Sequence, residues 1–216
     1  MRYPNAFKGV KKIWLAEILM LLAAALGIAL IVIAALNGTF EGEQVTVSDS
    51  VAGISGVIAI VTALLMLVAF VLNLIGLISA RKDEKAFGTA LLVTLVGIVT
   101  SVISSVWSKN ATLVKWMDLA TTLCSLYASY FVLTGIANLA ETFPDEATKS
   151  LALKSRNLLV GTFCATALFK CIITIFNIQE GSTANSILAV VALVLELVSY
   201  VVYLRALSKG KKMLAA

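Results

Sequence analysis

The chain has 216 residues, of which 60% are hydrophobic and 13% are charged, with a formal net charge of +5. A soluble domain is roughly half apolar and about a quarter charged, and a globule of this size must still expose a large polar surface. The composition therefore argues against a water-soluble fold and predicts an integral membrane protein.

Long apolar runs predict the membrane-spanning helices, each of which needs about 20 apolar residues. The first run is longer than the core of a cleaved signal peptide, which has about 7–15 residues, so we expect a true first helix. We predict an all-α, polytopic bundle of six transmembrane helices that forms one domain over residues 1–216. The predicted spans are residues 13–36, 52–80, 86–107, 112–140, 156–178 and 183–205.

The positions of Lys and Arg predict the orientation, because these residues are enriched in cytoplasmic loops. They cluster at both ends of the chain and in the connections after the second and fourth spans. The opposite loops hold only Lys109 and Lys115. Both termini are therefore predicted to be cytoplasmic. This orientation signal, with a weak attraction to anionic lipids, explains the positive charge, so no nucleic-acid partner is expected.

Two kinds of connection stand out between the spans. The outer segment 37–50, NGTFEGEQVTVSDS, is acidic, and its EQVTVS part alternates as a β-strand does. We expect it to be ordered and to cover the mouth of the bundle as a lid. Two inner turns each place an Asp-Glu pair, Asp83-Glu84 and Asp145-Glu146, where the next helix begins. Carboxylates there favour the positive end of the helix dipole.

Small and hydroxylated residues recur along one face of several spans. Such stripes are typical of close helix packing in lipid, where Ser and Thr also bond to their own backbone. A second interpretation is a water-filled cavity lined by hydroxyl groups. The stripes comprise Asp118, Thr122, Ser125 and Ser129 in the fourth span, Thr162, Thr166, Lys170 and Thr174 in the fifth, and Ala192, Ser199, Tyr200 and Tyr203 beside Glu196 in the sixth.

Three ionisable residues, Asp118, Lys170 and Glu196, lie within consecutive spans. Insertion scales give a central charge a cost of about 2.5–3.5 kcal/mol. At 1.5 Å per residue, Asp118, Lys170 and Glu196 lie about 9, 12 and 20 Å below the outer ends of their spans. We expect Lys170 to pair with one or both acids. The group is either a structural ion pair that fixes helix register or part of a ligand or ion site.

The sequence lacks the usual patterns of membrane enzymes. It has no histidine, and we find no GxSxG motif and no glycine-rich phosphate loop. Its three cysteines lie in apolar runs without CxxC spacing and are expected to be small buried hydrophobes. We therefore predict a protein that is not an enzyme, with no catalytic residue, no metal and no cofactor.

The main hypothesis is that the protein binds or translocates a small solute or ion through an outward-facing polar site between spans four to six. The alternative is a structural or assembly subunit that packs against partner helices. In size and layout the chain resembles the substrate-binding subunits of bacterial vitamin transporters, although no residue motif carries the likeness. We expect a multi-pass protein of a bacterial plasma membrane, whose partners are the lipid bilayer, a small solute, and a partner membrane subunit or a second copy. The predicted ligand-binding residues are Asp118, Lys170, Glu196, Thr122, Thr166, Ser199 and Tyr200.

Overall fold

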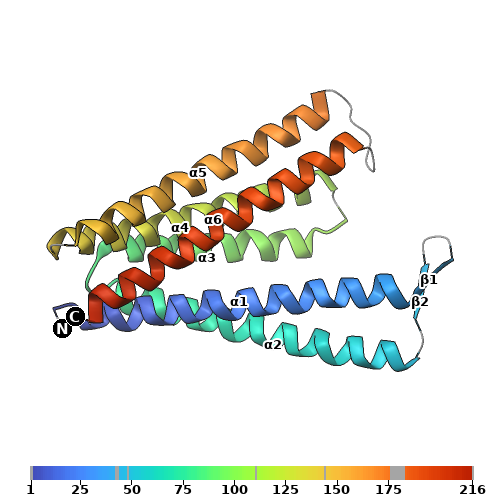
Figure 1. Cartoon of the computed structure of the whole chain (residues 1–216), viewed down its shortest axis with the longest axis horizontal. Coiled ribbons are helices and arrows are strands. Elements are labelled where there is room, and N and C mark those ends of the chain that lie inside the picture. Colours follow the sequence, from blue (N-terminus) through green and yellow to red (C-terminus); the bar gives the residue numbers. More distant parts are fainter. Residues whose placement is uncertain are drawn as a thin grey trace. The chain divides into compact units, whose positions relative to one another are not determined.

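The computed structural model describes the backbone of residues 2–41, 44–47, 49–109, 111–143, 145–175 and 183–215. Side chains are described for residues 2–33, 53–109, 112–143, 145–169, 172, 183 and 185–215. Within these residues the chain forms six helices and one β-hairpin (Figure 1). The elements are α1 (Pro4–Asn37), β1 (Gly38–Glu41), β2 (Gln44–Val47), α2 (Asp49–Ala80), α3 (Lys85–Val106), α4 (Ala111–Thr142), α5 (Glu146–Ile175) and α6 (Thr183–Ala215).

Five helices are long and apolar enough to cross a membrane, so the chain is a multi-pass membrane protein, as predicted. Lipid offers no hydrogen-bond partners to the backbone, so a segment in the membrane must satisfy its own backbone groups, as a helix does. Within its described residues α5 is not among the five. Its first turns carry Glu146, Lys149, Lys154 and Arg156, which lower its apolar character. The five segments are Pro4–Ile33, Gly53–Ala80, Lys85–Val106, Thr112–Thr142 and Asn185–Ala215.

The chain divides into two compact units, with boundaries inside α1 and α2. Unit 1 comprises residues 1–10 and 77–216, and unit 2 comprises residues 11–76. We describe each unit by itself. That the whole chain forms a single domain stays a prediction.

Unit 2 contains most of α1 and α2, which are joined by the β-hairpin (Figure 1). The strands pair antiparallel, with Gly38 opposite Val47 and Glu41 opposite Gln44. The β-branched residues of β2 favour this extended backbone. The strand-like alternation therefore predicted real strands, an addition to the otherwise all-helical fold. That the hairpin forms a lid stays a prediction.

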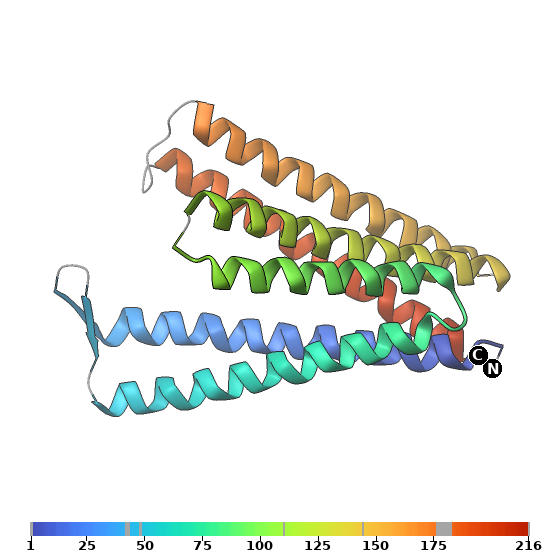
Figure 2. The same cartoon turned by 180° about the vertical axis from the view of Figure 1, so that it is seen from behind.

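Unit 1 contains α3, α4, α5 and α6, and α4, α5 and α6 each run opposite to the helix before them (Figures 1 and 2). The helix α4 packs against both α3 and α5, and α6 packs against α5 and touches α4. Glycines allow the closest approaches, as is common in membrane bundles. A Cβ atom on Gly135 would lie 2.7 Å from the Phe87 ring, and one on Gly210 would lie 2.9 Å from Ile136.

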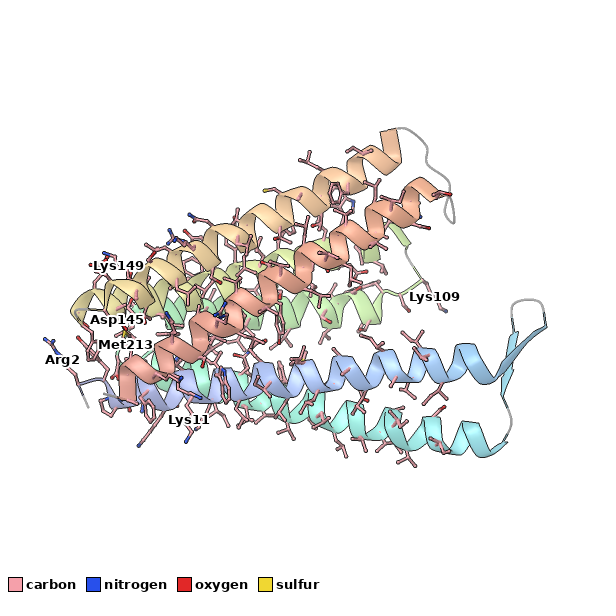
Figure 3. All side chains as sticks on the ribbon, viewed as in Figure 1. Arg2, Lys11, Lys109, Asp145, Lys149 and Met213 are labelled. Atoms are coloured by element: carbon pink, nitrogen blue, oxygen red, sulfur yellow. The ribbon has the colours of Figure 1, made fainter. Side chains whose placement is uncertain are left out.

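The apolar core of unit 1 lies toward the end that holds the N-terminal segment and the end of α6. Figure 3 shows Arg2, Asp145, Lys149 and Met213 at this end and Lys109 at the opposite one. We call the first the near end and the second the far end. The largest fully buried apolar side chains of unit 1 come from near-end stretches of its helices; they are Val10, Leu77, Phe87, Leu133, Ile136, Leu139, Leu207 and Leu214.

The N-terminal segment is fixed to the two turns at the near end. Asp83 accepts hydrogen bonds from the Ala6 backbone N–H at 2.7 Å and from Asn5 Nδ2 at 3.0 Å. Arg2 Nη1 donates to the Thr142 carbonyl at 3.1 Å. Because α1 begins at Pro4, the Asp83 carboxylate satisfies one of the unpaired N–H groups of its first turn, that of Ala6.

The other acids of the two turns cap the helices that follow them. The Glu84 side chain accepts from the Ala86 N–H at the start of α3 and also from Asn138 Nδ2 at 3.0 Å. Asp145 accepts from the Thr148 hydroxyl at 2.6 Å and from the Thr148 N–H at 3.0 Å. The Asp-Glu pairs thus lie at helix starts, as predicted, but Asp83 binds α1 rather than α3.

Candidate functional site

A cavity of about 900 Å³ lies between α4, α5 and α6, inside unit 1. Small-molecule sites are typically clefts of about 300–1,000 Å³ with a largely apolar lining and a few polar groups. The cavity lies on the far side of the buried core, because its lining begins at Lys115, close to the start of α4, and extends to Ser129. The three helices are the ones from which the sequence predicted a polar site.

The two long faces of α4 have different surroundings. Asp118, Thr122, Ser125 and Ser129 line the cavity, at the helical spacing of three and four residues. The neighbouring face packs on α3, where Thr121 Oγ1 lies 2.9 Å from Thr100 Oγ1. The residues of the polar stripe predicted in this span therefore line a cavity.

Asp118 connects the cavity wall to the helix behind it. Its Oδ1 atom accepts a hydrogen bond from Ser104 Oγ of α3 at 3.0 Å. Its backbone carbonyl accepts from the Thr122 hydroxyl at 2.8 Å. One side chain of the cavity wall is thus positioned by α3, which does not itself line the cavity.

The helix α6 separates its polar and apolar residues in the same way. Ala189, Ala192, Glu196 and Ser199 line the cavity. Leu193, Val194, Leu197 and Val198 lie outside the lining and are half or more exposed, at 56%, 52%, 52% and 50%. Glu196, the carboxylate inside the apolar run VALVLELVSY, is among the residues that line the cavity, and its side chain is also exposed.

Two buried hydroxyl groups of the lining have no hydrogen-bond partner among the described residues. Thr162 of α5 is 8% exposed, Ser199 of α6 is 1% exposed, and both line the cavity. Most buried polar groups are hydrogen-bonded, and leaving one unpaired costs about 1–3 kcal/mol. By contrast, Thr166 donates to the Phe163 carbonyl at 3.0 Å. Thr162 and Ser199 are therefore the lining hydroxyls best suited to bond to a ligand.

The charged groups of the described lining are Lys115, Asp118 and Glu196. Glu196 forms no hydrogen bond or ion pair with any described residue. Lys170 belongs to α5, but its side chain lies outside the described residues. The predicted pairing of Lys170 with either acid is therefore still a prediction.

Six of the seven predicted ligand-binding residues lie together in the structure, and the side chain of the seventh, Lys170, lies outside the described residues. Asp118, Thr122, Thr166, Glu196, Ser199 and Tyr200 all line the cavity. Tyr203, predicted on the same stripe, is instead buried, with its ring 6.3 Å from that of Tyr200. Whether this lining binds a ligand is a separate question.

The sequence reasoning missed Lys115 and two aromatic lining residues, Phe163 and Phe169. Lys115 was assigned to an outer loop, although it lies within α4. Phe163 lies next to Thr162 and three residues before Thr166. Extending the threonine stripe by one residue to either side would have found it.

No group of three or more metal-binding side chains occurs among the described residues. The predicted burial of the cysteines is wrong for Cys164, which is exposed, while Cys124 is half-buried. Cys171 lies outside the described side chains.

Comparisons of the chain with protein-family models, with curated proteins and with solved structures give no match.

Proposed function

We propose that the protein binds or translocates a small solute in the cavity between α4, α5 and α6. The observation that carries the proposal is a cavity of about 900 Å³ with two carboxylates and two buried, unpartnered hydroxyls in its lining. A bundle built only for packing would bond these groups to each other or replace them with apolar ones. A polar solute or water in the cavity would satisfy them.

The proposal includes six membrane crossings, with α5 as the one between α4 and α6. The end of α4 lies at the near end, where Arg2 bonds Thr142, whereas α6 begins at the far end (Figure 1). The chain between them must cover the same distance, so α5 crosses the layer that α4 and α6 cross. The near end carries most of the Lys and Arg residues, which supports a cytoplasmic near end and a cavity that opens outward from the plasma membrane.

Thiol labelling tests the proposal. In a chain whose three native cysteines are replaced by alanine, Ala192→Cys places a thiol in the cavity lining, and Leu193→Cys places one on the outward apolar face. Lys109→Cys, in the far-end turn, is the control for an exposed thiol. The probe is a charged, membrane-impermeant methanethiosulfonate added outside intact cells. We expect fast labelling at position 109, measurable labelling at 192 and almost none at 193.

The runner-up function is a structural subunit of a membrane complex. The observation in its favour is the exposed apolar face of α3, with Leu92, Leu95, Val99 and Val102, which a partner helix could cover as well as lipid. A dry cavity would support this alternative. Equal, negligible labelling at positions 192 and 193, with normal labelling at 109, would therefore overturn the solute-binding proposal. If position 109 were labelled only from the inside, the predicted orientation would be reversed. The comparison of positions 192 and 193 would then be made with the reagent on the inner side.

A further inference from the structure

We infer that the cavity is selective for cations, and that its solute is an organic amine or ammonium ion with a largely apolar body, for which Glu196 is the counter-ion. The inference rests on the proposed function, because it names the solute class of the same cavity. It depends on the depth of the charges, on the aromatic rings and on the two unpartnered hydroxyls.

The charges of the described lining are divided by depth. Lys115 is four residues from the start of α4, about 6 Å along the helix, and its side chain is exposed. Glu196 is thirteen residues from the start of α6, about 20 Å along. Because Asp118 already accepts a hydrogen bond from Ser104, Glu196 is the carboxylate left without a described partner. The deeper part of the cavity therefore carries a negative charge and lacks a described positive one.

Arg156 of α5, a described cation outside the lining, is already engaged elsewhere. The Arg156 guanidinium lies over the Tyr130 ring, at 4.9 Å from its centroid, and its Nη1 atom lies 3.5 Å from Thr134 Oγ1. Arg156 is not part of the lining. An anionic solute would therefore meet the Glu196 carboxylate in the deeper part of the cavity without a described cation to offset it.

Aromatic rings also line the cavity. Phe163 and Phe169 of α5 and Tyr200 of α6 line the cavity, and Tyr200 lies four residues after Glu196 on the same helix face. The negative faces of aromatic rings attract ammonium groups within about 6 Å of their centroids. The apolar remainder of the lining, such as Leu126 and Leu188, suits an apolar body and disfavours a hydrated inorganic ion.

The two unpartnered hydroxyls complete the recognition of an amine. Ser199 lies three residues after Glu196, one turn away on the cavity face. Thr162 faces the same cavity from α5. A hydroxyl oxygen can accept a hydrogen bond, so an ammonium N–H group bound by Glu196 could also donate to one of these oxygens. The same contact would satisfy a group that is otherwise buried and unpaired.

A pair of reagents of similar size and opposite charge tests the inference. The Ala192→Cys variant is labelled with a trimethylammonium-ethyl or a sulfonatoethyl methanethiosulfonate, and each rate is divided by the rate at Lys109→Cys. We expect the normalised rate of the cation to exceed that of the anion by about tenfold or more, as for one unit charge at short range. Glu196→Gln should remove most of this preference. Glu141→Gln, which changes an exposed carboxylate paired with Lys149 at the near end, should leave it unchanged.

The arms separate this inference from the proposed function. A cation preference no greater than at position 109, or one that survives Glu196→Gln, would overturn the inference while the labelling still showed an open cavity. A lack of labelling by both reagents at position 192 would overturn the proposed function itself. Lys170→Met removes a cation from α5 and should hold or raise the preference, so a fall would also count against the inference.

A second measurement covers the case in which Glu196→Gln does not fold. Benzyltrimethylammonium should slow the reaction of Ala192→Cys with uncharged N-ethylmaleimide in the otherwise unchanged protein, and phenylacetate of similar size should not. Equal protection by both compounds, or protection by phenylacetate alone, would contradict a cation-selective cavity.

Discussion

The contact between Gly135 of α4 and Phe87 of α3 offers the sharpest test of the packing in unit 1. A Cβ atom on Gly135 would lie 2.7, 2.9 and 3.1 Å from three carbons of the Phe87 ring. Carbon atoms pack best at about 3.5–4.0 Å, so the ring would have to retreat by most of an ångström. Phe87 is 0% exposed and has no solvent-facing space into which to move. Gly135→Ala should therefore strain the crossing of α3 and α4.

The magnitude follows from comparison with Gly161→Ala in α5, where nothing lies within 4 Å of the added methyl group. Both changes gain the helix propensity of alanine over glycine, about 1 kcal/mol, and this gain cancels in the comparison. Extra methylenes in a packed core cost about 1–3 kcal/mol. We expect Gly135→Ala to be less stable than Gly161→Ala by about that amount.

Reversible unfolding in mixed detergent micelles, followed by circular dichroism, measures this difference. Phe87→Leu should make the Gly135→Ala change milder, with a coupling free energy of about 0.5–3 kcal/mol in the double-mutant cycle. If Gly135→Ala stabilises the protein as much as Gly161→Ala does, the reasoning is refuted. The two helices would then cross with more space than the distances to Phe87 indicate.

Two further predictions concern the near-end acids. Asp83→Ala removes the acceptor of the Ala6 N–H and of the Asn5 amide, so we expect a loss of about 1 kcal/mol and faster hydrogen exchange at the N-terminal amides; unchanged exchange would show that the segment is held by other contacts. The Thr148 hydroxyl and N–H hold the pKa of Asp145 below its ordinary value of about 3.8. The carboxylate therefore contributes stability above that pH and loses it as the pH falls through the lowered pKa, so Asp145→Ala should make the unfolding temperature less dependent on pH below about pH 4. An identical pH dependence in both proteins would contradict this role.

The positions of the helices could be predicted from the sequence because lipid imposes a simple rule. Backbone groups in hydrocarbon must bond within their own segment, so a long apolar run predicts a helix. The helical period then places residues three and four apart on one face. From this period alone, Asp118 and Thr122 were predicted to share one helix face, and Glu196 and Ser199 to share another.

The ends of the helices were harder to predict. Hydropathy indicates which residues suit the hydrocarbon layer, but it does not indicate how far the backbone hydrogen bonds of the helix continue beyond that layer. The helix α6 continues to Ala215, ten residues beyond the predicted span. The Asp145-Glu146 pair marked the start of α5, which begins at Glu146, although the predicted apolar span started only at residue 156. Arg156 stands at that predicted boundary. It lies inside α5, where the Tyr130 ring and Thr134 accommodate its guanidinium.

Contacts between distant segments could not be predicted from local pattern. Asp83 was expected near the start of α3, yet its carboxylate bonds Ala6, which is 77 residues away in the sequence. The unpaired N–H groups at the start of α1 attract a carboxylate as strongly as those of α3 do, and only the folded arrangement decides which helix it caps. The pairing of Lys170 is a question of the same kind, since the sequence predicts two acids on neighbouring helices as its partners.

The division of unit 1 into a packed near end and a cavity toward the far end has a physical consequence for binding. Two unpaired buried hydroxyls would together cost about 2–6 kcal/mol, an amount comparable with the whole stability of many proteins. The close packing around Phe87, Leu133 and Leu207 and the caps on the near-end turns lie at the near end of the bundle. The two unpaired hydroxyls lie in the cavity, toward the other end. Contacts to a solute in the cavity would therefore add to the stability of helices already held at one end, and the near-end contacts need not break for the solute to enter.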